Sequence, residues 1–531
     1  MSTTRQAGKV ITLLVTCLGF FMVLLDASIV TIALPTIQID LHANLADLQW
    51  AVDAYTLPLA ALMLTAGTLG DRFGRKRLFL FGLVLFLIGS TFCGFAPTLG
   101  WFLFGRVIQG IGGAALSPGS LSVLVSAFPE PRERAQAIGI WAGISGVALA
   151  AGPLVGGLLI QVSSWPSIFF VNLPVGMIAL VVGWPLLAES RNPLAQRIDL
   201  AGQVLVTGGL TCLVMALIES SSQGWTSPLI LGLLLGAALL LGAFLLVEAR
   251  VREPLLPLEL FVKQLFSVTM VAALFAGFVL MGTVFFIAQY FQAVQGYTAL
   301  ESGLRTLPAT MGMFVIAPLA GRLTSRLGPR LPIVLGALLA GISLLLMTQI
   351  APDSAYAGIW WKMGMFGIGF GLMLSPLTTA LLSATPPTRA GLGSSMINTS
   401  RQVGSALGIA VLGAFVVQQF ASNIAAQLTQ RGIPGQLSAT IAQKLASAGS
   451  QASRIPLSAH LQLSQVALRQ ALGQAFVDAL HGSFLISGIA LLVTALLVAL
   501  FLQQKQPATR TSVAPASAQV AAGAGAVQDI G

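Results

Sequence analysis

Two charged residues, Asp26 and Arg106, stand in long apolar stretches that contain no other charged residue. A carboxylate in the middle of an apolar membrane helix costs roughly 3 kcal/mol on insertion scales, and it is kept mainly where it faces a cavity or a charged partner. A carboxyl group in such surroundings can bind and release a proton, and a guanidinium beside it balances its charge. The two residues therefore predict either proton exchange or a fixed ion pair between two helices.

The chain lacks the residue sets that enzymes use to break bonds within a membrane. It has no second acid deep in an apolar segment, since Asp53 and the other acids are expected near segment ends, and it has no Walker sequence for direct use of ATP. Its histidines show no metal-ligand spacing, and its cysteines lie inside apolar segments, which predicts no disulfide framework. These residues are His42, His460, His481, Cys17, Cys93 and Cys212. We therefore expect neither an enzyme nor a bound cofactor or metal.

The composition requires a lipid bilayer, because 56% of the 531 residues are hydrophobic and only 8% are charged. A membrane helix needs about 20 apolar residues, and the sequence predicts fourteen such segments. They are expected at residues 10–34, 50–69, 78–96, 101–127, 136–160, 167–187, 200–219, 229–247, 266–290, 303–323, 331–350, 358–383, 391–417 and 481–502. The predicted fold class is an all-α polytopic membrane protein.

The positions of lysine and arginine predict how the chain is oriented. They gather at the N-terminus, in the C-terminal tail and in the loops that follow even-numbered segments. Cytoplasmic loops carry this excess of cations, so both termini are expected in the cytoplasm, with the protein in the inner (plasma) membrane. The net charge of +10 is explained by this topology, and no nucleic-acid partner is expected.

The sequence contains a diverged internal repeat. GTLGDRFGRK at residues 67–76 recurs as GRLTSRLGPR at residues 321–330, with Asp71 replaced by Ser325 and Arg75 by Pro329. Further matches follow at offsets of 254 to 258 residues, and many membrane transporters consist of two such halves facing one site.

The repeat predicts a 6+2+6 arrangement of the fourteen segments. Two six-helix halves, at residues 1–195 and 251–505, flank two inserted linker helices at residues 196–250. Residues 421–478 are expected to form a long external loop with room for short amphipathic helices, and residues 506–531 a disordered cytoplasmic tail.

Asp26 and Arg106 are predicted to lie at matching depths. The first segment runs outward and the fourth runs inward, so at 1.5 Å per residue Asp26 lies about 13 Å from Pro35, and Arg106 about 9 Å below Gly100. The second half has Met281 at the position of Asp26, so any proton chemistry is expected in the first half alone.

Four motifs give the chain a recognisable family. They are LDASIVTIALP (Leu25–Pro35), GTLGDRFGRK, FGRVIQGIGGA (Phe104–Ala114) and AGPLVGG (Ala151–Gly157). From about residue 10 to residue 502 the chain resembles the fourteen-span drug/proton antiporters of the major facilitator superfamily. The resemblance implies a multidrug exporter driven by a proton gradient, with Asp26 and Arg106 as the proton-coupling residues.

The resemblance also assigns roles to two of the motifs. GTLGDRFGRK is expected to form a charge latch between the halves, although its cations would also hold this loop in the cytoplasm whatever its role. The latch residues are Gly67, Asp71, Arg72, Gly74, Arg75 and Lys76. Gly152, Pro153, Gly156 and Gly157 belong to the antiporter motif, which is expected to make a close contact that blocks proton leak, or simply to pack helices.

The cargo is harder to predict from the sequence. Aromatic and polar residues in the spans could line a substrate cavity, and those we expect there are Tyr55, Gln109, Met281, Phe285, Phe286, Gln289, Asn398 and Arg401. The aromatic residues could equally face lipid. The family favours a cationic drug, whereas Arg401, without an evident acidic partner, would suit an amphiphilic anion or a zwitterion.

We expect a proton-coupled exporter of small lipophilic compounds that works by alternating access and functions as a monomer in the bilayer. The alternatives are an exporter of an amphiphilic anion, lipid or metabolite, and an importer or uniporter with the same fold. A membrane-embedded enzyme is the reading that the residues support least.

Overall fold

The computed structural model describes residues 2–191, 199–251, 253–385, 390–430, 435–448 and 465–502. Every regular element in these ranges is helical. The N-terminal half consists of α1 (Ser2–Asp40), α2 (Leu45–Phe73), α3 (Arg75–Gly94), α4 (Leu99–Ala127), α5 (Pro131–Val162), α6 (Ser167–Phe170) and α7 (Asn172–Leu186). The inserted pair is α8 (Leu200–Gln223) and α9 (Pro228–Glu248).

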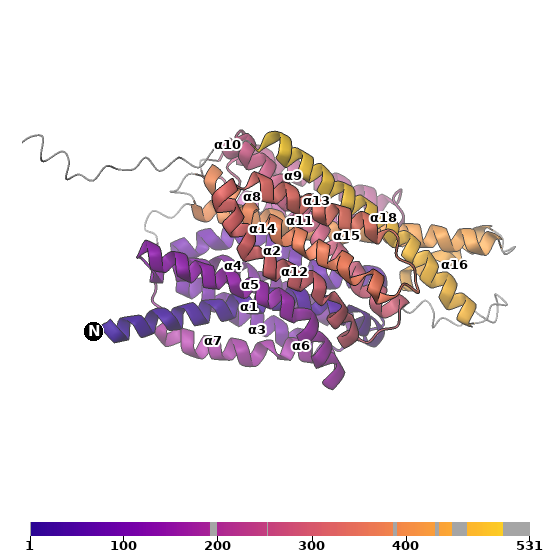
Figure 1. The fold of residues 1–531 in the computed structure, drawn as a ribbon, viewed down its shortest axis with the longest axis horizontal. Coiled ribbons are helices and arrows are strands. Elements are labelled where there is room, and N and C mark those ends of the chain that lie inside the picture. The colour runs from indigo at the N-terminus through magenta and orange to yellow at the C-terminus, as the bar shows by residue number, and fades with distance from the viewer. Residues whose placement is uncertain are drawn as a thin grey trace, which may run out of the picture.

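The C-terminal half repeats this pattern. Its elements are α10 (Leu258–Phe261), α11 (Gln264–Gln289), the π-helix η1 (Tyr290–Val294), α12 (Ala299–Leu327), α13 (Arg330–Met347), the 3₁₀-helix η2 (Tyr356–Gly358), α14 (Trp360–Ala384), α15 (Ala390–Gln430), α16 (Gly435–Ala448) and α18 (Gln465–Phe501). Figure 1 shows the two halves side by side, with α1–α7 below and the C-terminal helices above.

Thirteen helices in the described part of the chain are long and apolar enough to cross a membrane. The expected fold class, an all-α polytopic membrane protein, is thereby confirmed. The remaining predicted segment, at residues 136–160, lies on α5, whose described apolar stretch is the shorter Ala151–Val162. The number fourteen therefore stays a prediction.

Matching local signals begin and end the equivalent helices α2 and α12. Asn44 and Asp47 form a reciprocal capping box at the start of α2, and Thr298 and Glu301 form one at the start of α12. Each box satisfies two backbone N–H groups that the first turn leaves without partners. Both helices then end at a glycine with positive φ, Gly74 at 121° and Gly328 at 77°.

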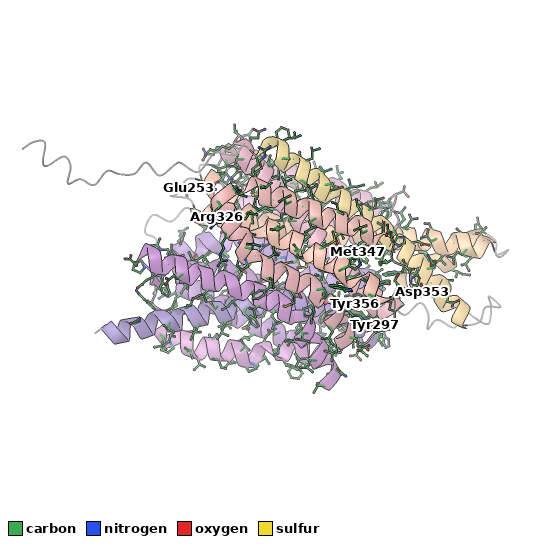
Figure 2. The ribbon with its side chains drawn as sticks, in the orientation of Figure 1. Glu253, Tyr297, Arg326, Met347, Asp353 and Tyr356 are labelled. Carbon is green, nitrogen blue, oxygen red and sulfur yellow. The ribbon has the colours of Figure 1, made fainter. Side chains whose placement is uncertain are left out.

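We use "outer end" for the side that holds Asp40, Leu45 and Ala299, which the charge distribution predicts to lie outside the cell, and "inner end" for the opposite side. Figure 2 shows Arg326 at the inner end of the C-terminal half, and Tyr297, Tyr356 and Asp353 at its outer end. The halves meet where α1 packs against α11 and α12, where α5 packs against α12, and where α2 packs against α15.

The inserted helix α8 packs against both α2 and α15. Its Glu219 Oε1 accepts a hydrogen bond from the Trp50 indole at 3.1 Å, and its Gln203 Nε2 donates to the Ala61 carbonyl at 2.9 Å. The linker helix is therefore fixed to the seam between the halves.

The segment predicted as a loop at residues 421–478 is largely helical where it is described. Helix α15 continues to Gln430, α16 covers Gly435–Ala448, and α18 begins at Gln465. The tail predicted at residues 506–531 lies outside the described residues.

Candidate functional site

A buried ion pair lies in the N-terminal half. Arg106 Nη1 on α4 is 2.5 Å from Asp26 Oδ2 on α1, and both side chains are essentially inaccessible, at 1% and 0% exposure. The guanidinium also donates from Nε to the Ala51 carbonyl at 3.0 Å and from Nη1 to Gln109 Oε1 at 2.9 Å. The two residues whose depths were predicted to match are thus in direct contact.

A shell of neutral groups completes the hydrogen bonds of this pair. Gln109 Nε2 donates to Asp26 Oδ1 at 3.0 Å and to Ser90 Oγ at 2.9 Å. Asn172 Nδ2 on α7 lies 3.4 Å from the same Asp26 oxygen and 3.3 Å from Ser90 Oγ. A buried pair is tolerable when its remaining hydrogen bonds are made. Here α2 supplies the Ala51 carbonyl, α4 supplies Gln109 and α7 supplies Asn172, while Ser90 on α3 accepts from both amides.

Tyr55 and Gln109, which we expected in the substrate cavity, belong to this cluster. The Tyr55 ring lies beneath the guanidinium, 4.4 Å from Arg106 Cζ, and its hydroxyl donates to the Val23 carbonyl at 3.0 Å. Sequence reasoning missed Ser90 and Asn172, whose only signal was a polar side chain in an apolar segment.

The predicted latch residues lie at the inner end, between α2 and α3. Arg75 Nη2 is 2.8 Å from Asp71 Oδ1, one helical turn earlier in the chain. Glu189, which follows α7 and was not predicted, accepts from the Lys76 backbone N–H at 3.1 Å and lies 3.7 Å from Arg77 Nε. All of these partners belong to the N-terminal half. At the repeat position, Ser325 Oγ donates to the Arg322 carbonyl within its own helix.

Two glycines of the antiporter motif press α5 against α1. A Cβ atom on Gly152 would stand 1.9 Å from Ser28 Oγ, and one on Gly156 would stand 2.6 Å from Ile29 Cγ1. Only glycine fits where two helices approach this closely.

The other side of α5 joins the two halves. A Cβ on Gly157 would stand 2.5 Å from Leu300 Cα on α12, and one on Gly303 of α12 would stand 2.2 Å from the Pro153 carbonyl oxygen. Nearby, Gln292 Nε2 donates across the interface to the Ile32 carbonyl at 2.9 Å. The outer ends of the halves are therefore in tight contact on this side.

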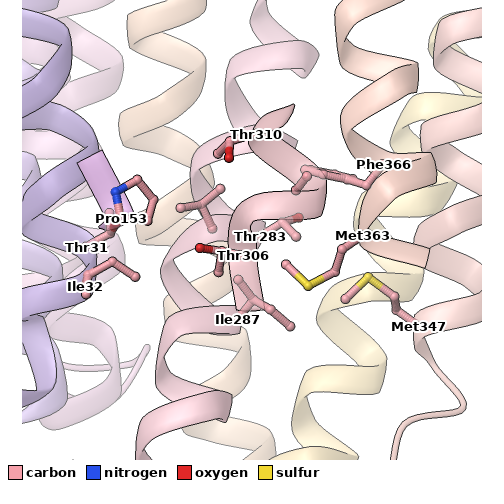
Figure 3. Close-up of a pocket in the computed structure, with 12 residues that line it drawn as sticks. Thr31, Ile32, Pro153, Thr283, Ile287, Thr306, Thr310, Met347, Met363 and Phe366 are labelled. Carbon is pink, nitrogen blue, oxygen red and sulfur yellow. The ribbon is translucent and has the colours of Figure 1, made fainter. Parts of the chain in front are cut away.

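A cavity lies beside this contact, between the halves. Figure 3 shows Pro153 and Ile32 on one side of it, Met363 and Phe366 on the other, and threonines between them. Its lining residues are Thr31, Ile32, Pro153, Thr283, Val284, Ile287, Thr306, Ala309, Thr310, Met347, Met363 and Phe366. None of these is charged, and the buried Thr283 hydroxyl has no hydrogen-bond partner.

The remaining residues that we expected in the substrate cavity are not among its lining. Phe285 and Phe286 are fully buried in an apolar core that includes residues of both halves, so they do not face lipid, and Met281 packs against the same core. Gln289 is also buried, on the same helix. Arg401 donates from Nη2 to Asn398 Oδ1 at 2.9 Å, three residues away on α15.

Comparison with known proteins agrees with this architecture. Residues 16–409 match the family model described as Major Facilitator Superfamily. The tetracenomycin C resistance and export protein of Streptomyces glaucescens is 37% identical over 506 residues, which are 94% of this chain and 92% of that protein. The multidrug resistance protein Stp of Mycobacterium tuberculosis (strain CDC 1551 / Oshkosh) is 37% identical over 80% of this chain and 79% of its own. The methylenomycin A resistance protein of Streptomyces coelicolor (strain ATCC BAA-471 / A3(2) / M145) is 35% identical over 77% and 85%.

Solved structures share the fold at lower identity. An inward-facing, unoccupied bacterial homolog of the human lysosomal transporter Spinster superposes with a TM-score of 0.65 at 20% identity, over 94% of this chain and 99% of that one. A D-xylose-proton symporter gives a TM-score of 0.58 at 14% identity, over 92% and 97%. On the strength of the family match and these relatives, the chain belongs to the Major Facilitator Superfamily and is an integral membrane transporter.

Proposed function

We propose that this protein is a proton-coupled antiporter that exports small lipophilic compounds, cationic drugs among them, by alternating access between its two halves. The relatives' names support export, since they describe resistance and export proteins. The observation that carries the proton coupling is the buried pair of Asp26 and Arg106.

In the proposed cycle, Asp26 binds a proton when water from the outer side reaches it and releases that proton on the inner side. Protonation removes the negative charge that faces Arg106, so the guanidinium loses its ionic partner and keeps its bonds to Gln109 and the Ala51 carbonyl. The free energy of the buried Asp26–Arg106 pair therefore depends on whether Asp26 is protonated. Because Gln109, Ser90 and Asn172 link the pair to α3, α4 and α7, a change at Asp26 reaches most of the N-terminal half.

The antiporter motif is proposed to prevent leak in this cycle. Gly157 and Gly303 bring α5 and α12 so close that their outer ends leave no room for a side chain. A contact of this kind keeps water away from Asp26 while the outer end is closed. The latch at Asp71 and Arg75 is proposed to bind the halves at the inner end in the outward-open state and to release in the inward-open one.

The cavity between the halves suits a lipophilic cargo, because its walls are apolar except for threonine hydroxyls. A cationic drug is the cargo that the family favours. The second candidate, an uncharged or anionic amphiphile, is favoured by one observation, namely that no carboxylate lines this cavity. The two candidates differ in cargo and share the transport cycle.

The test is proton-gradient-dependent efflux in inside-out membrane vesicles, with ethidium as the cationic dye and a carboxylated fluorescein as the anionic one. We expect uptake into the vesicles that requires a proton gradient and collapses with an uncoupler. The variant Asp26→Asn serves as the paired control, because it keeps the shape of the side chain and cannot exchange the proton. Transport of either dye that is indifferent to the gradient would indicate a uniporter and overturn the proposal.

A further inference from the structure

Two buried acids meet at the inner end of the inserted helix pair. Asp199 is the residue before α8 and is 8% exposed, and Glu248 is the last residue of α9 and is 3% exposed. Figure 2 shows Glu253, which follows α9, at the inner end together with Arg326. The two acids therefore lie where the chain enters the linker helices from one half and leaves them towards the other.

Each acid uses one carboxylate oxygen to bind the backbone. Asp199 Oδ1 accepts a hydrogen bond from the Gly202 N–H at 2.8 Å, and Glu248 Oε2 accepts one from the Leu256 N–H at 3.0 Å. Hydrogen bonds from N–H groups to a carboxylate favour its charged form. These bonds fix Asp199 to the first turn of α8 and Glu248 to the segment that leads into the C-terminal half.

The other oxygen of each acid has no hydrogen-bond partner, and the two face the same point. These unpartnered atoms are Asp199 Oδ2 and Glu248 Oε1. A Cβ on Gly202 would stand 2.4 Å from the first and 2.8 Å from the second, so the two oxygens are no farther apart than these distances together. Because residue 202 is a glycine, its side chain does not occupy the space beside the two oxygens.

In the described part of the chain, no lysine or arginine forms an ion pair with either acid. Two ionised carboxylates this close repel each other, and burial keeps the repulsion strong because salt and water screen it only weakly. A cation between Asp199 and Glu248 would remove the repulsion and give each unpartnered oxygen a ligand.

The donor set determines which cation fits. Carboxylate oxygens are the hard ligands that magnesium and calcium take. The described residues contain no group of three or more histidine, cysteine, aspartate or glutamate side chains that could hold a metal, so water has to supply the remaining ligands. Magnesium is commonly bound through one or two carboxylates and keeps several waters, whereas calcium takes roughly six to eight oxygen ligands. The pair therefore suits magnesium.

We propose that Asp199 and Glu248 form a binding site for a divalent cation, namely magnesium, which joins the start of α8 to the end of α9. Gln203 on α8 is bonded to α2, and Glu248 is bonded to Leu256, so the cation fixes the linker pair to the N-terminal half at the point where the chain passes to the other half. The acids stand far apart in the sequence, which is why no motif spacing predicted them as metal ligands.

The test measures metal binding to the purified full-length protein, with Mn²⁺ as a paramagnetic substitute for Mg²⁺. A nitroxide label is attached at Val204, which is exposed near the inner end of α8, or at Thr226, which is exposed beyond its outer end. The background has Cys17, Cys93 and Cys212 replaced by alanine. Since the 24 residues of α8 span about 36 Å, Mn²⁺ should broaden the nitroxide spectrum at Val204 far more than at Thr226. Added Mg²⁺ should reverse the broadening by competition.

The variants Asp199→Asn and Glu248→Gln should each weaken this Mn²⁺ binding by more than the roughly tenfold that is typical of a lost outer-shell partner, because each removes a ligand charge. Glu219→Gln is the matched control, since it removes an acid from the outer end of the same helix and should leave binding unchanged. Parent-like broadening at Val204 in both acid variants overturns the proposal. A parent that shows no broadening there also overturns it, and would indicate that the two acids share a proton instead.

A further variant keeps both acids in case their replacements fail to fold. Gly202→Ala places a methyl group against the two unpartnered oxygens and should weaken Mn²⁺ binding. Gly208→Ala is its control on the same helix, because the new Cβ would stand 3.3 Å from Leu240 Cδ1, the end of a flexible side chain. Equal Mn²⁺ affinity in Gly202→Ala and Gly208→Ala contradicts the proposed site.

Discussion

At the scale of single residues, the chemistry rests on charges placed where water is excluded. Asp26 is held by three donors, from Arg106, Gln109 and Asn172, so its negative charge is fully balanced. Asp53 has no donor at all. The two carboxyl groups lie in the same half within spans of similar composition, and their difference comes entirely from what the neighbouring helices present to them.

The first prediction concerns the ion pair. Asp26→Asn should abolish gradient-driven efflux while the protein still inserts, since an amide cannot carry the proton. Arg106→Ala should also abolish it, because an unpaired buried charge and several unmade hydrogen bonds remain, at a cost of about 3–5 kcal/mol. Dye efflux and the amount of protein in the membrane are measured together. Undiminished efflux by Asp26→Asn would exclude the coupling role.

The second prediction concerns Arg401 and the charge of the cargo. If the cargo is cationic, Arg401→Ala should leave its efflux intact or improve it, since removing a like charge from a low-dielectric region lowers repulsion. If the cargo is anionic, the same change should weaken its binding. We expect the first outcome, measured as efflux of ethidium and of a carboxylated fluorescein. Equal loss for both dyes in a folded variant would make Arg401 a structural or gating residue.

At the scale of elements, the repeat has kept helix signals and lost charges. The capping boxes and the glycine ends of α2 and α12 correspond at an offset of 254 residues. The acid of the latch was not kept, because Ser325 stands where Asp71 stands in the first half. Capping residues and terminal glycines act on the helix that contains them, and both copies have them. A charged side chain such as Asp71 depends on a partner, and only the first copy has it.

The third prediction follows from this asymmetry of the latch. Asp71→Asn should impair transport, because Arg75 loses its ion-pair partner, while Ser325→Ala should have little effect, since it removes only a bond within one helix turn. Efflux rates of the two variants, normalised to protein in the membrane, provide the measurement. Comparable damage at both positions would contradict a one-sided latch.

At the scale of the whole molecule, close contacts join the two halves at the outer end. The tight approach of α5 to α12 and the seam of α2 with α15 both involve backbone or small side chains. The cavity lies beside the first of these contacts and includes Pro153 of the same motif. We therefore propose that cargo binding and closure of the outer end involve some of the same residues.

The fourth prediction tests the contact between the halves. Gly157→Val should prevent α5 from meeting Leu300, and overpacking of this kind costs about 1–3 kcal/mol. The outer-closed state should then lose roughly tenfold in population, and export should fall with it. Gly139→Val lies on the same helix with no atom near its Cβ position and is the matched control. Equal export by the two variants would remove the contact from the transport cycle.

The sequence by itself determined the membrane, the helices and the two-fold organisation, because these depend on composition and on patterns along the chain. It also predicted that Asp26 and Arg106 share a depth, since helical rise converts residue number into depth. It did not determine which way each side chain faces. That direction is set by lateral packing, which brought Ser90, Asn172 and Glu189 into the site, buried Phe285 and Phe286 in the core, and left Asp53 buried without a hydrogen-bond partner. Depth is a property of one helix, but a partner is a property of two, so only the tertiary structure decided which charges are paired.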